Sequence, residues 1–369
     1  MAKKPAPPKS PKPTKRRAKP APKSTRKAAV KSRKAAPKSA AKPAAKPAAK
    51  STRGKTKAKA TPKSAAKPAP RKATTKPAAI SVPPVQGPIA AYTMYGGPPV
   101  RAAVRRWWAG IAARLADAGM TGVPAKPTFT LGERDQWTHP NLLLAQTCGY
   151  PMMKGVTGPV RLIATPVYDV PFADGVNYCS LVIVAKKSKA ISLMDLRGMR
   201  AAITKPTSHS GYNAFRRLIA DYVVQWEAEM GGDIADLAGG RRFFASVIET
   251  GNHLNSVKAV AAGRADVAAI DCVSFHFIKA LAPDAMKKVR ILTATPEAPG
   301  LPLITAGWRS DEEVGVLRSA VMDTLGDAGL KAALAMLRIS GFQVLPREAY
   351  KLTLEMEREA QERNYPALQ

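Results

Sequence analysis

The stretch FASVIETGNHLNSVKAVAAGRADVAAID, residues 244–271, has the pattern that decides the fold. Its apolar residues predict a strand at 244–249, an amphipathic helix at 254–262 and a second strand at 267–270. Strands that alternate with helices are typical of a largely parallel sheet covered by helices. This stretch therefore predicts an α/β fold.

The same alternation continues on both sides of this stretch. Apolar runs predict strands at 89–94, 129–131, 160–167, 178–185, 201–204, 291–294 and 303–307. Helical spacing and capping residues predict helices at 100–115, 140–144, 212–223, 311–325, 330–338 and 348–363. Residues 88–369 are therefore expected to form one large α/β region.

The first 80 residues differ in composition from the rest. They contain 27 Lys and Arg residues and no acidic residue, whereas the remaining 289 hold 32 basic and 26 acidic residues. Such a segment buries too little apolar surface to offset the entropy of ordering its backbone. We therefore predict a disordered Lys/Ala/Pro-rich tail at 1–80 and a linker at 81–87.

The positive charge of the tail predicts binding to a nucleic acid, separate from any ligand of the α/β region. Dense Lys and Arg on a flexible chain bind the phosphates of DNA or RNA in a salt-sensitive way, without reading base sequence. The composition resembles the tails of linker-histone-like bacterial proteins. The alternative is a solubilising or spurious upstream extension.

The run Thr-Ser-His-Ser-Gly-Tyr at 207–212 is the leading candidate for a binding site. A helix that starts here presents unpaired N–H groups and the positive end of its dipole, which together stabilise an oxyanion. The hydroxyls of Ser208 and Ser210 add donors, and Gly211 allows close approach. The alternative is that Thr207 or Ser208 only caps the helix.

Asp271 is the second candidate because it ends an apolar strand that should point into a cleft. A carboxylate there accepts a proton from a monoprotonated oxyanion or an amine and repels a fully ionised oxyanion. The alternative is a buried Asp that caps a neighbouring element. His209 and His253 are further candidate donors.

The remaining polar residues show no pattern for a metal, a cofactor or catalysis. Cys148, Cys179 and Cys272 form no CxxC pair and are expected to be buried thiols, and the four His residues lack metal-site spacing. The sequence contains no recognisable nucleophile–base pair, carboxylate pair or Walker-type phosphate loop, so we predict no catalysis. No export signal is visible, which predicts a cytoplasmic location. The alternative is the periplasm, if the true start differs or export is non-standard.

Four motifs together resemble one family. They are Leu-Met-Asp-Leu-Arg-Gly at 193–198, Ser-His-Ser-Gly-Tyr-Asn at 208–213, Gly-Arg-Ala-Asp-Val-Ala-Ala-Ile-Asp at 263–271 and Gly-Phe at 341–342. The order and spacing resemble the phosphate, phosphite and phosphonate type of substrate-binding protein from ABC importers, which has the type II periplasmic binding fold. The resemblance implies a two-lobed venus flytrap at 88–369, with crossing segments near 167–177 and 295–301. Lobe 1 would comprise 88–167 and 300–369, and lobe 2 would comprise 178–290.

The resemblance also implies a function and further site residues. The function is non-catalytic binding of a small oxyanion by a monomer, with an ABC permease as a further partner. Tyr95 and Tyr178 resemble the family's ligand-contacting tyrosines, with a purely structural role as the alternative, and Gln146 and Tyr150 are candidates from the loop Gln-Thr-Cys-Gly-Tyr-Pro. Two other functions stay open: a nucleic-acid-associated ligand sensor that uses the tail, and an enzyme on the same fold.

Overall fold

The computed structural model describes residues 87–229 and 242–369. All of them belong to one unit that spans residues 79–369. The predicted tail at 1–80, and the predicted linker at 81–87 apart from Gly87, lie outside the described residues. The other described residues therefore belong to the predicted α/β region.

The first lobe is built on a five-stranded sheet. In spatial order its strands are β1 (Ile89–Ala91), β2 (Leu142–Gln146), β11 (Leu303–Ala306), β3 (Val160–Tyr168) and β12 (Ile339–Gln343). Its helices are α1 (Arg101–Asp117), α2 (Glu133–Trp137), α3 (Gly149–Met153), α8 (Asp311–Met322) and α9 (Lys331–Met336). Ile111 of α1 and Leu317 of α8 are fully buried in the core that these elements share. Removing such side chains from water is the main stabilising contribution to the lobe.

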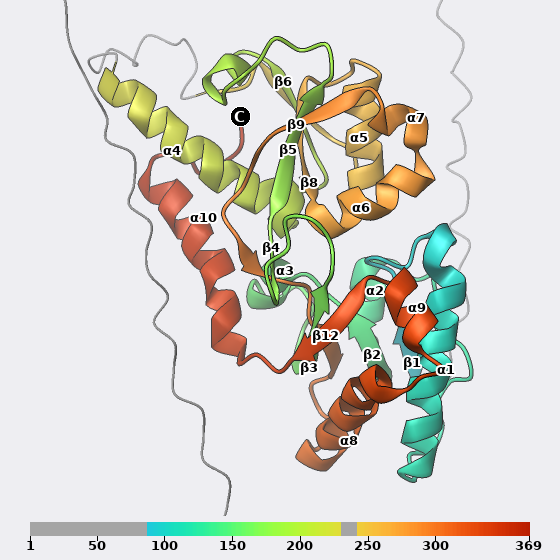
Figure 1. Cartoon of the computed structure of the whole chain (residues 1–369). Helices are drawn as coiled ribbons and strands as arrows, with labels where there is room; N and C mark the ends of the chain where they lie inside the picture. Colours follow the sequence, from blue (N-terminus) through green and yellow to red (C-terminus); the bar gives the residue numbers. More distant parts are fainter. Residues whose placement is uncertain (1–86, 230–241) are drawn as a thin grey trace, which may run out of the picture. The chain divides into compact units, whose positions relative to one another are not determined.

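The second lobe has a five-stranded sheet of its own. In spatial order its strands are β7 (Ser246–Glu249), β6 (Arg200–Ile203), β8 (Val267–Asp271), β5 (Ser180–Ala185) and β9 (Val289–Ala294). Its helices are α4 (Ala214–Glu229), α5 (His253–Ala261), α6 (Cys272–Leu281) and α7 (Pro283–Met286). The chain passes from one sheet to the other twice, through the paired short strands β4 (Asn177–Tyr178) and β10 (Ala298–Pro299) (Figure 1). The predicted two-lobed α/β fold is confirmed.

The strand directions correct one expectation. Parallel pairs are β1 with β2, and β6 with both β7 and β8, while the other pairs in both five-stranded sheets are antiparallel. The prediction of a largely parallel sheet was therefore wrong. The reason is that β5 and β11 are the first strands after the two crossings, and each runs against both of its neighbours.

Two short elements also differ from the sequence prediction. The predicted helix at 140–144 is strand β2, which is fully buried between β1 and β11. A short apolar run has no period that separates strand from helix, so the pairing decides its structure. The predicted strand at 129–131 is absent from the described elements, and Thr128 forms an isolated bridge with Ala91 instead.

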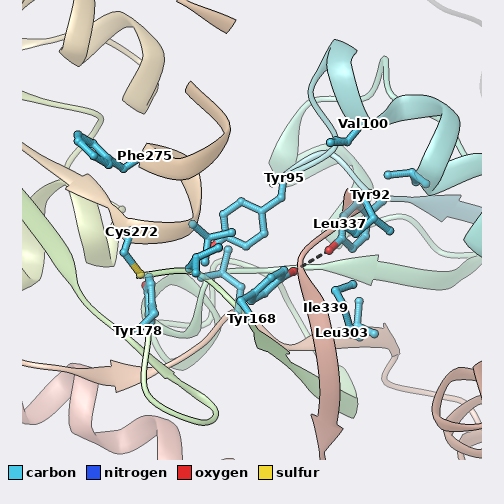
Figure 2. Close-up of a cluster of buried hydrophobic side chains, with 14 of the residues drawn as sticks. Tyr92, Tyr95, Val100, Tyr168, Tyr178, Cys272, Phe275, Leu303, Leu337 and Ile339 are labelled. Carbon is cyan, nitrogen blue, oxygen red and sulfur yellow. Dashed lines mark hydrogen bonds between the residues drawn. The ribbon is translucent and has the colours of Figure 1, made fainter. Parts of the chain in front are cut away.

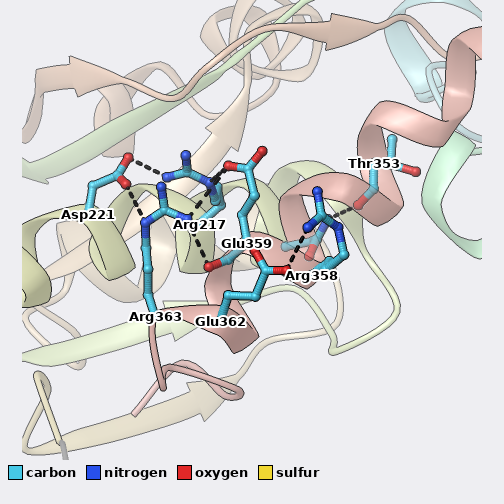
Figure 3. Close-up of polar contacts among 8 residues, drawn as sticks. Arg217, Asp221, Thr353, Arg358, Glu359, Glu362 and Arg363 are labelled. Atoms are coloured by element: carbon cyan, nitrogen blue, oxygen red, sulfur yellow. Dashed lines mark hydrogen bonds and ion pairs between the residues drawn. The ribbon is translucent and has the colours of Figure 1, made fainter.

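The C-terminal helix α10 (Leu352–Glu362) packs along α4 of the second lobe (Figure 1). Ion pairs Arg217–Glu359 and Arg363–Asp221, the latter at 2.9 Å, join the two helices (Figure 3). Three apolar residues of α10 and the segment after it are buried in the core of the second lobe, namely Ala360, Tyr365 and Leu368. Residues 352–369, which the resemblance assigned to lobe 1, thus contact lobe 2, and the exact lobe boundaries stay a prediction.

No helix within residues 87–229 and 242–369 combines the length and the apolar character that crossing a membrane requires.

Candidate functional site

A cavity of about 400 Å³ lies between the two lobes. The first lobe contributes the segment that follows β1 and the start of α2. The second lobe contributes the segment between β6 and α4, the start of α5, the end of β8 and one face of α6. The polar or charged residues that line it are Thr93, Tyr95, Glu133, Cys148, Thr204, Lys205, Thr207, Ser208, Ser210, Asn252, His253, Asp271 and Ser274.

The predicted helix start lines this cavity through Ser208 and Ser210. The chain enters α4 through a π-helical turn at His209–Asn213, and Ser208 Oγ accepts a hydrogen bond of 3.0 Å from the N–H of Gly211. Ser208 therefore caps the helix, as the alternative prediction held. A hydroxyl that accepts one hydrogen bond still has its proton to donate, so capping leaves Ser208 able to donate to a ligand.

Gly211 does not line the cavity, and its role is steric. A Cβ atom at this position would lie 2.2 Å from Thr204 Oγ1 and 2.6 Å from Thr204 Cγ2. The helix start thus packs directly on the residue that follows β6. Thr204 itself lines the cavity, and its buried Oγ1 has no hydrogen-bond partner among the described residues. Thr204 is therefore a candidate ligand donor that the sequence analysis missed, and its signal was its place at the end of a predicted strand.

We expect Gly211→Ala to destabilise the domain by about 1–3 kcal/mol, because the new methyl group overpacks a well-filled contact. Gly315→Ala in α8 is the matched control, since nothing lies within 4 Å of its Cβ position. That control should be neutral or stabilising by up to about 1 kcal/mol. Urea unfolding measures both changes, and equal stability of the two variants would contradict the steric role.

Asp271 and Tyr95 meet across the cavity from the two lobes. The Tyr95 hydroxyl donates a 2.6 Å hydrogen bond to Asp271 Oδ2, and the N–H of Ser274 donates one of 2.7 Å to Oδ1. Asp271 thus caps α6, as its alternative prediction held, and also lines the cavity. Burial raises the pKa of Asp271 to about 6, although its hydrogen bonds with Tyr95 and Ser274 act in the opposite direction.

A cluster of tyrosines holds Tyr95 in place (Figure 2). The ring of Tyr95 packs edge-on against Tyr168, with centroids 5.2 Å apart, and the hydroxyls of Tyr168 and Tyr92 are 2.7 Å apart. Gln146 Nε2 donates to the Tyr168 hydroxyl at 3.1 Å and to the carbonyl of Leu301 at 3.0 Å. Gln146 is fully buried and does not line the cavity, so it supports Tyr168 from behind.

The two candidate histidines occupy different places. His253 lines the cavity, and its Nε2 lies 3.0 Å from Ser210 Oγ. His209 lies behind the helix start, where its Nδ1 is 3.2 Å from Asn213 Nδ2. Burial lowers the pKa of both imidazoles to about 4. Both rings are therefore neutral near pH 7, and only His253 is placed to contact a ligand.

Tyr150 and Tyr178 are buried and do not line the cavity. Their rings flank His209, with centroid distances of 6.4 and 6.2 Å. Burial raises the pKa of both hydroxyls, so both stay protonated. The Tyr178 hydroxyl interacts with Ser210 and Cys148, which places it directly behind the lining. Cys148, Cys179 and Cys272 are buried thiols, as predicted.

Lys205 and Glu133 form an ion pair of 2.6 Å that joins the lobes at the cavity wall. Of the described lining residues, Lys205 is the only Lys or Arg. Because Glu133 neutralises it, the hydroxyls and the N–H groups of the helix start supply most of the attraction for an anion. No local sequence pattern predicts this ion pair, because 72 residues separate its members.

Helix α6 is a further element that the sequence analysis missed. Four of its residues line the cavity, namely Ser274, Phe277, Ile278 and Leu281. Their spacing of i, i+3, i+4 and i+7 is that of one helical face. This spacing was the available signal.

Comparison with known families identifies this architecture. The model of the family described as "ABC transporter, phosphonate, periplasmic substrate-binding protein" matches residues 141–350. This match covers more than half of the chain. The chain belongs to this family. Among the residues that the structure describes, no cluster of three or more His, Cys, Asp or Glu could hold a metal ion.

Solved structures share the fold of this phosphonate-binding family. A binding protein component of an ABC phosphonate transporter from Pseudomonas aeruginosa is 19% identical, with a TM-score of 0.59, over 75% of this chain and 88% of that one. PhnD1 from Prochlorococcus marinus, in complex with methylphosphonate, is 16% identical, with a TM-score of 0.54, over 74% and 98%. XAC2383 from Xanthomonas citri, bound to chloride ion, is 16% identical, with a TM-score of 0.54, over 75% and 98%. A search of the curated proteins finds no match.

Family membership corrects the predicted location. The family is one of periplasmic substrate-binding proteins of ABC importers, so the prediction of a cytoplasmic location was wrong. That prediction relied on the absence of a visible export signal, which is a weaker observation than a family match over more than half of the chain.

Proposed function

We propose that this domain binds a phosphonate-type oxyanion in the cavity between its lobes, without catalysis, and delivers it to an ABC permease. The observation that carries the proposal is the composition of the cavity. The second lobe supplies the helix start with Ser208 and Ser210, and the first lobe supplies Tyr95, which contacts Asp271.

The proposed contacts follow from the donors at the helix start. Phosphonate oxygens accept hydrogen bonds from the hydroxyls of Ser208, Ser210 and Thr204 and from N–H groups at the start of α4, where the helix dipole is positive. Neutral His253 can donate from Nε2 to Ser210 Oγ, which leaves the proton of Ser210 for the ligand. Ionised Asp271 accepts a hydrogen bond from the P–O–H group of a monoprotonated phosphonate. A hydrogen bond in which one partner is charged is stronger than a neutral one.

Closure of the lobes over the ligand is the proposed trapping step. The Tyr95–Asp271 hydrogen bond and the Glu133–Lys205 ion pair both join the lobes at the cavity wall. The chain crosses between the lobes at the β4–β10 ladder, whose two short strands are the natural hinge. A ligand that bridges the two walls would favour the closed arrangement, because it contacts both lobes only there.

Titration calorimetry of the full chain with methylphosphonate, phosphite, phosphate and sulfate tests this proposal. We expect binding at one site per chain, with methylphosphonate tighter than sulfate. Phosphorus NMR of the same samples should show the ligand unchanged after prolonged incubation. Absence of binding by every phosphorus oxyanion would refute the binding proposal, and formation of a product would favour the enzyme alternative.

Nucleic-acid association through residues 1–80 is the second candidate function. Its support is the content of 27 basic and no acidic residues in that segment. Deleting residues 1–80 is expected to abolish salt-sensitive retention on DNA and to leave methylphosphonate binding unchanged. Equal retention of the full and shortened chains on DNA, measured across a salt series, would refute nucleic-acid association through residues 1–80.

A further inference from the structure

One face of α6 lines the cavity along its length, and its chemistry changes from one end to the other. Asp271, at the cap, and Ser274 are polar, whereas the next lining residues, Phe277, Ile278 and Leu281, are apolar. At 1.5 Å per residue the face from Ser274 to Leu281 extends about 10 Å. The cavity therefore has a polar end at Asp271 and an apolar end at Leu281.

The opposite wall is apolar at the same end. Pro98 and Val100, in the turn before α1, line the cavity from the first lobe. A Cβ atom at Gly97 would lie 3.6 Å from Leu281 Cδ1, so this turn faces the last residue of the α6 face. The ring of Phe277 lies 6.5 Å from that of Tyr95, centroid to centroid. The apolar part thus begins directly beyond the Tyr95–Asp271 contact.

The volume of the cavity exceeds what a small inorganic oxyanion would fill. A water molecule takes about 30 Å³ of liquid volume, and phosphate or phosphite has only about the bulk of a few waters. A cavity of about 400 Å³ is within the range of sites for larger organic ligands. The remaining volume borders the apolar face of α6, where a substituent would release water from apolar surface.

We propose that the preferred ligands are organophosphonates with an apolar alkyl or aryl substituent, which lies along Phe277, Ile278 and Leu281. This inference rests on the proposed function, because it places the phosphonate group at Ser208 and Ser210. An aminoalkyl substituent of the same length is disfavoured, since its ammonium group would enter the apolar end without a partner. Glu133, the other carboxylate that lines the cavity besides Asp271, is already paired with Lys205.

Calorimetry of the full chain with methyl-, butyl- and hexylphosphonate tests the substituent. Each fully buried methylene contributes about 0.8 kcal/mol, or roughly fourfold in affinity. Because the cavity is partly open to solvent, we expect hexylphosphonate to bind at least about tenfold more tightly than methylphosphonate. We expect 6-aminohexylphosphonate to bind more weakly than hexylphosphonate. Affinity that stays equal or falls from methyl to hexyl overturns the inference, as does tighter binding of the aminohexyl compound.

Leu281→Asn tests where the substituent lies. Leu281 is half-buried at the end of α6, so a polar replacement is compatible with folding. We expect hexylphosphonate affinity to fall about three- to tenfold and methylphosphonate affinity to fall by a smaller factor, because a methyl substituent is too short to lie along the whole α6 face. Leu325→Asn is the matched control, because Leu325 is 41% exposed and does not line the cavity, and it should change neither affinity. Thermal unfolding verifies that both variants fold.

The outcomes separate this inference from the function on which it rests. Binding of no phosphonate would refute the proposed function. Methylphosphonate binding without a gain for hexylphosphonate would leave the function standing and overturn the apolar substituent. A gain for hexylphosphonate that Leu281→Asn does not reduce would overturn its placement along α6.

Discussion

Replacing both Ser208 and Ser210 by alanine is expected to weaken methylphosphonate binding by at least about 100-fold. Each hydroxyl is placed to donate to the anion, and a hydrogen bond to a charged group contributes about 1.5–3 kcal/mol. Ser208 keeps its proton for the ligand because Oγ already accepts the N–H of Gly211. Titration calorimetry measures the loss directly.

The same double variant also removes a helix cap, which costs about 1 kcal/mol of stability. Ser310→Ala controls for this effect, since Ser310 caps α8 in a capping box and does not line the cavity. The control should lower the free energy of unfolding by a similar amount without changing affinity. Loss of affinity in proportion to stability in both variants would show that Ser208 and Ser210 only cap and pack.

Asp271→Asn is expected to remove the preference for a phosphonate over a sulfonate of the same shape. Methylphosphonate can donate a proton near neutral pH, whereas methanesulfonate has none. Above its pKa of about 6 the ionised Asp271 accepts a hydrogen bond from the first ligand and repels the second. We expect the preference to be roughly ten- to 100-fold in the natural chain near pH 7 and less than about threefold in the variant.

The pH dependence gives a second measurement of the same group. In the natural chain, methanesulfonate affinity should fall as the pH rises through about 6, because Asp271 gains its charge there. Neither neighbouring candidate titrates in this range, since burial lowers the pKa of His253 to about 4 and raises that of Tyr95 well above its usual value. Asp271→Asn should flatten the profile. A profile that keeps its fall near pH 6 in the variant would assign the titration to another group.

The same shifts predict how stability responds to acid. The raised pKa of Asp271 means that the folded state binds this proton more tightly, so its contribution to stability decreases as the pH rises from about 4 to about 6. The lowered pKa values of His209 and His253 make stability increase as the pH rises from about 4 to about 6.5, because the unfolded state binds their protons in this range. Between about pH 4 and 6, the effect of Asp271 on the free energy of unfolding therefore opposes that of the two histidines.

Local sequence patterns were enough to predict the position of many helices and strands of this chain. The strong runs at 160–167 and 267–270 are strands β3 and β8, and the helical spacing at 100–115 is α1. The signals at the start of α8 predicted a cap, and Ser310 forms it. These elements depend on interactions within a few residues, which sequence spacing encodes directly.

Some residues of the candidate site could be predicted from local sequence, whereas the positions of others depend on the tertiary structure. Ser208 and Ser210 were predictable because a helix start is a local feature, and both line the cavity. Gln146 and His209 were also singled out, but they lie behind the lining, where they position other side chains. A polar side chain near a strand end looks the same in sequence whether it points into a cavity or into the layer behind it.

The amino-acid sequence alone determined the α/β alternation, the capped helix starts and the family to which the motifs belong, because each depends on residues close together in the chain. Only the tertiary structure decided that Tyr95 meets Asp271 across 176 positions and that Glu133 meets Lys205 across 72. It also decided the antiparallel directions of β5 and β11 and the apolar face that α6 presents to the cavity. Such contacts form only when the two crossings bring distant segments together, and no local period records that long-range packing.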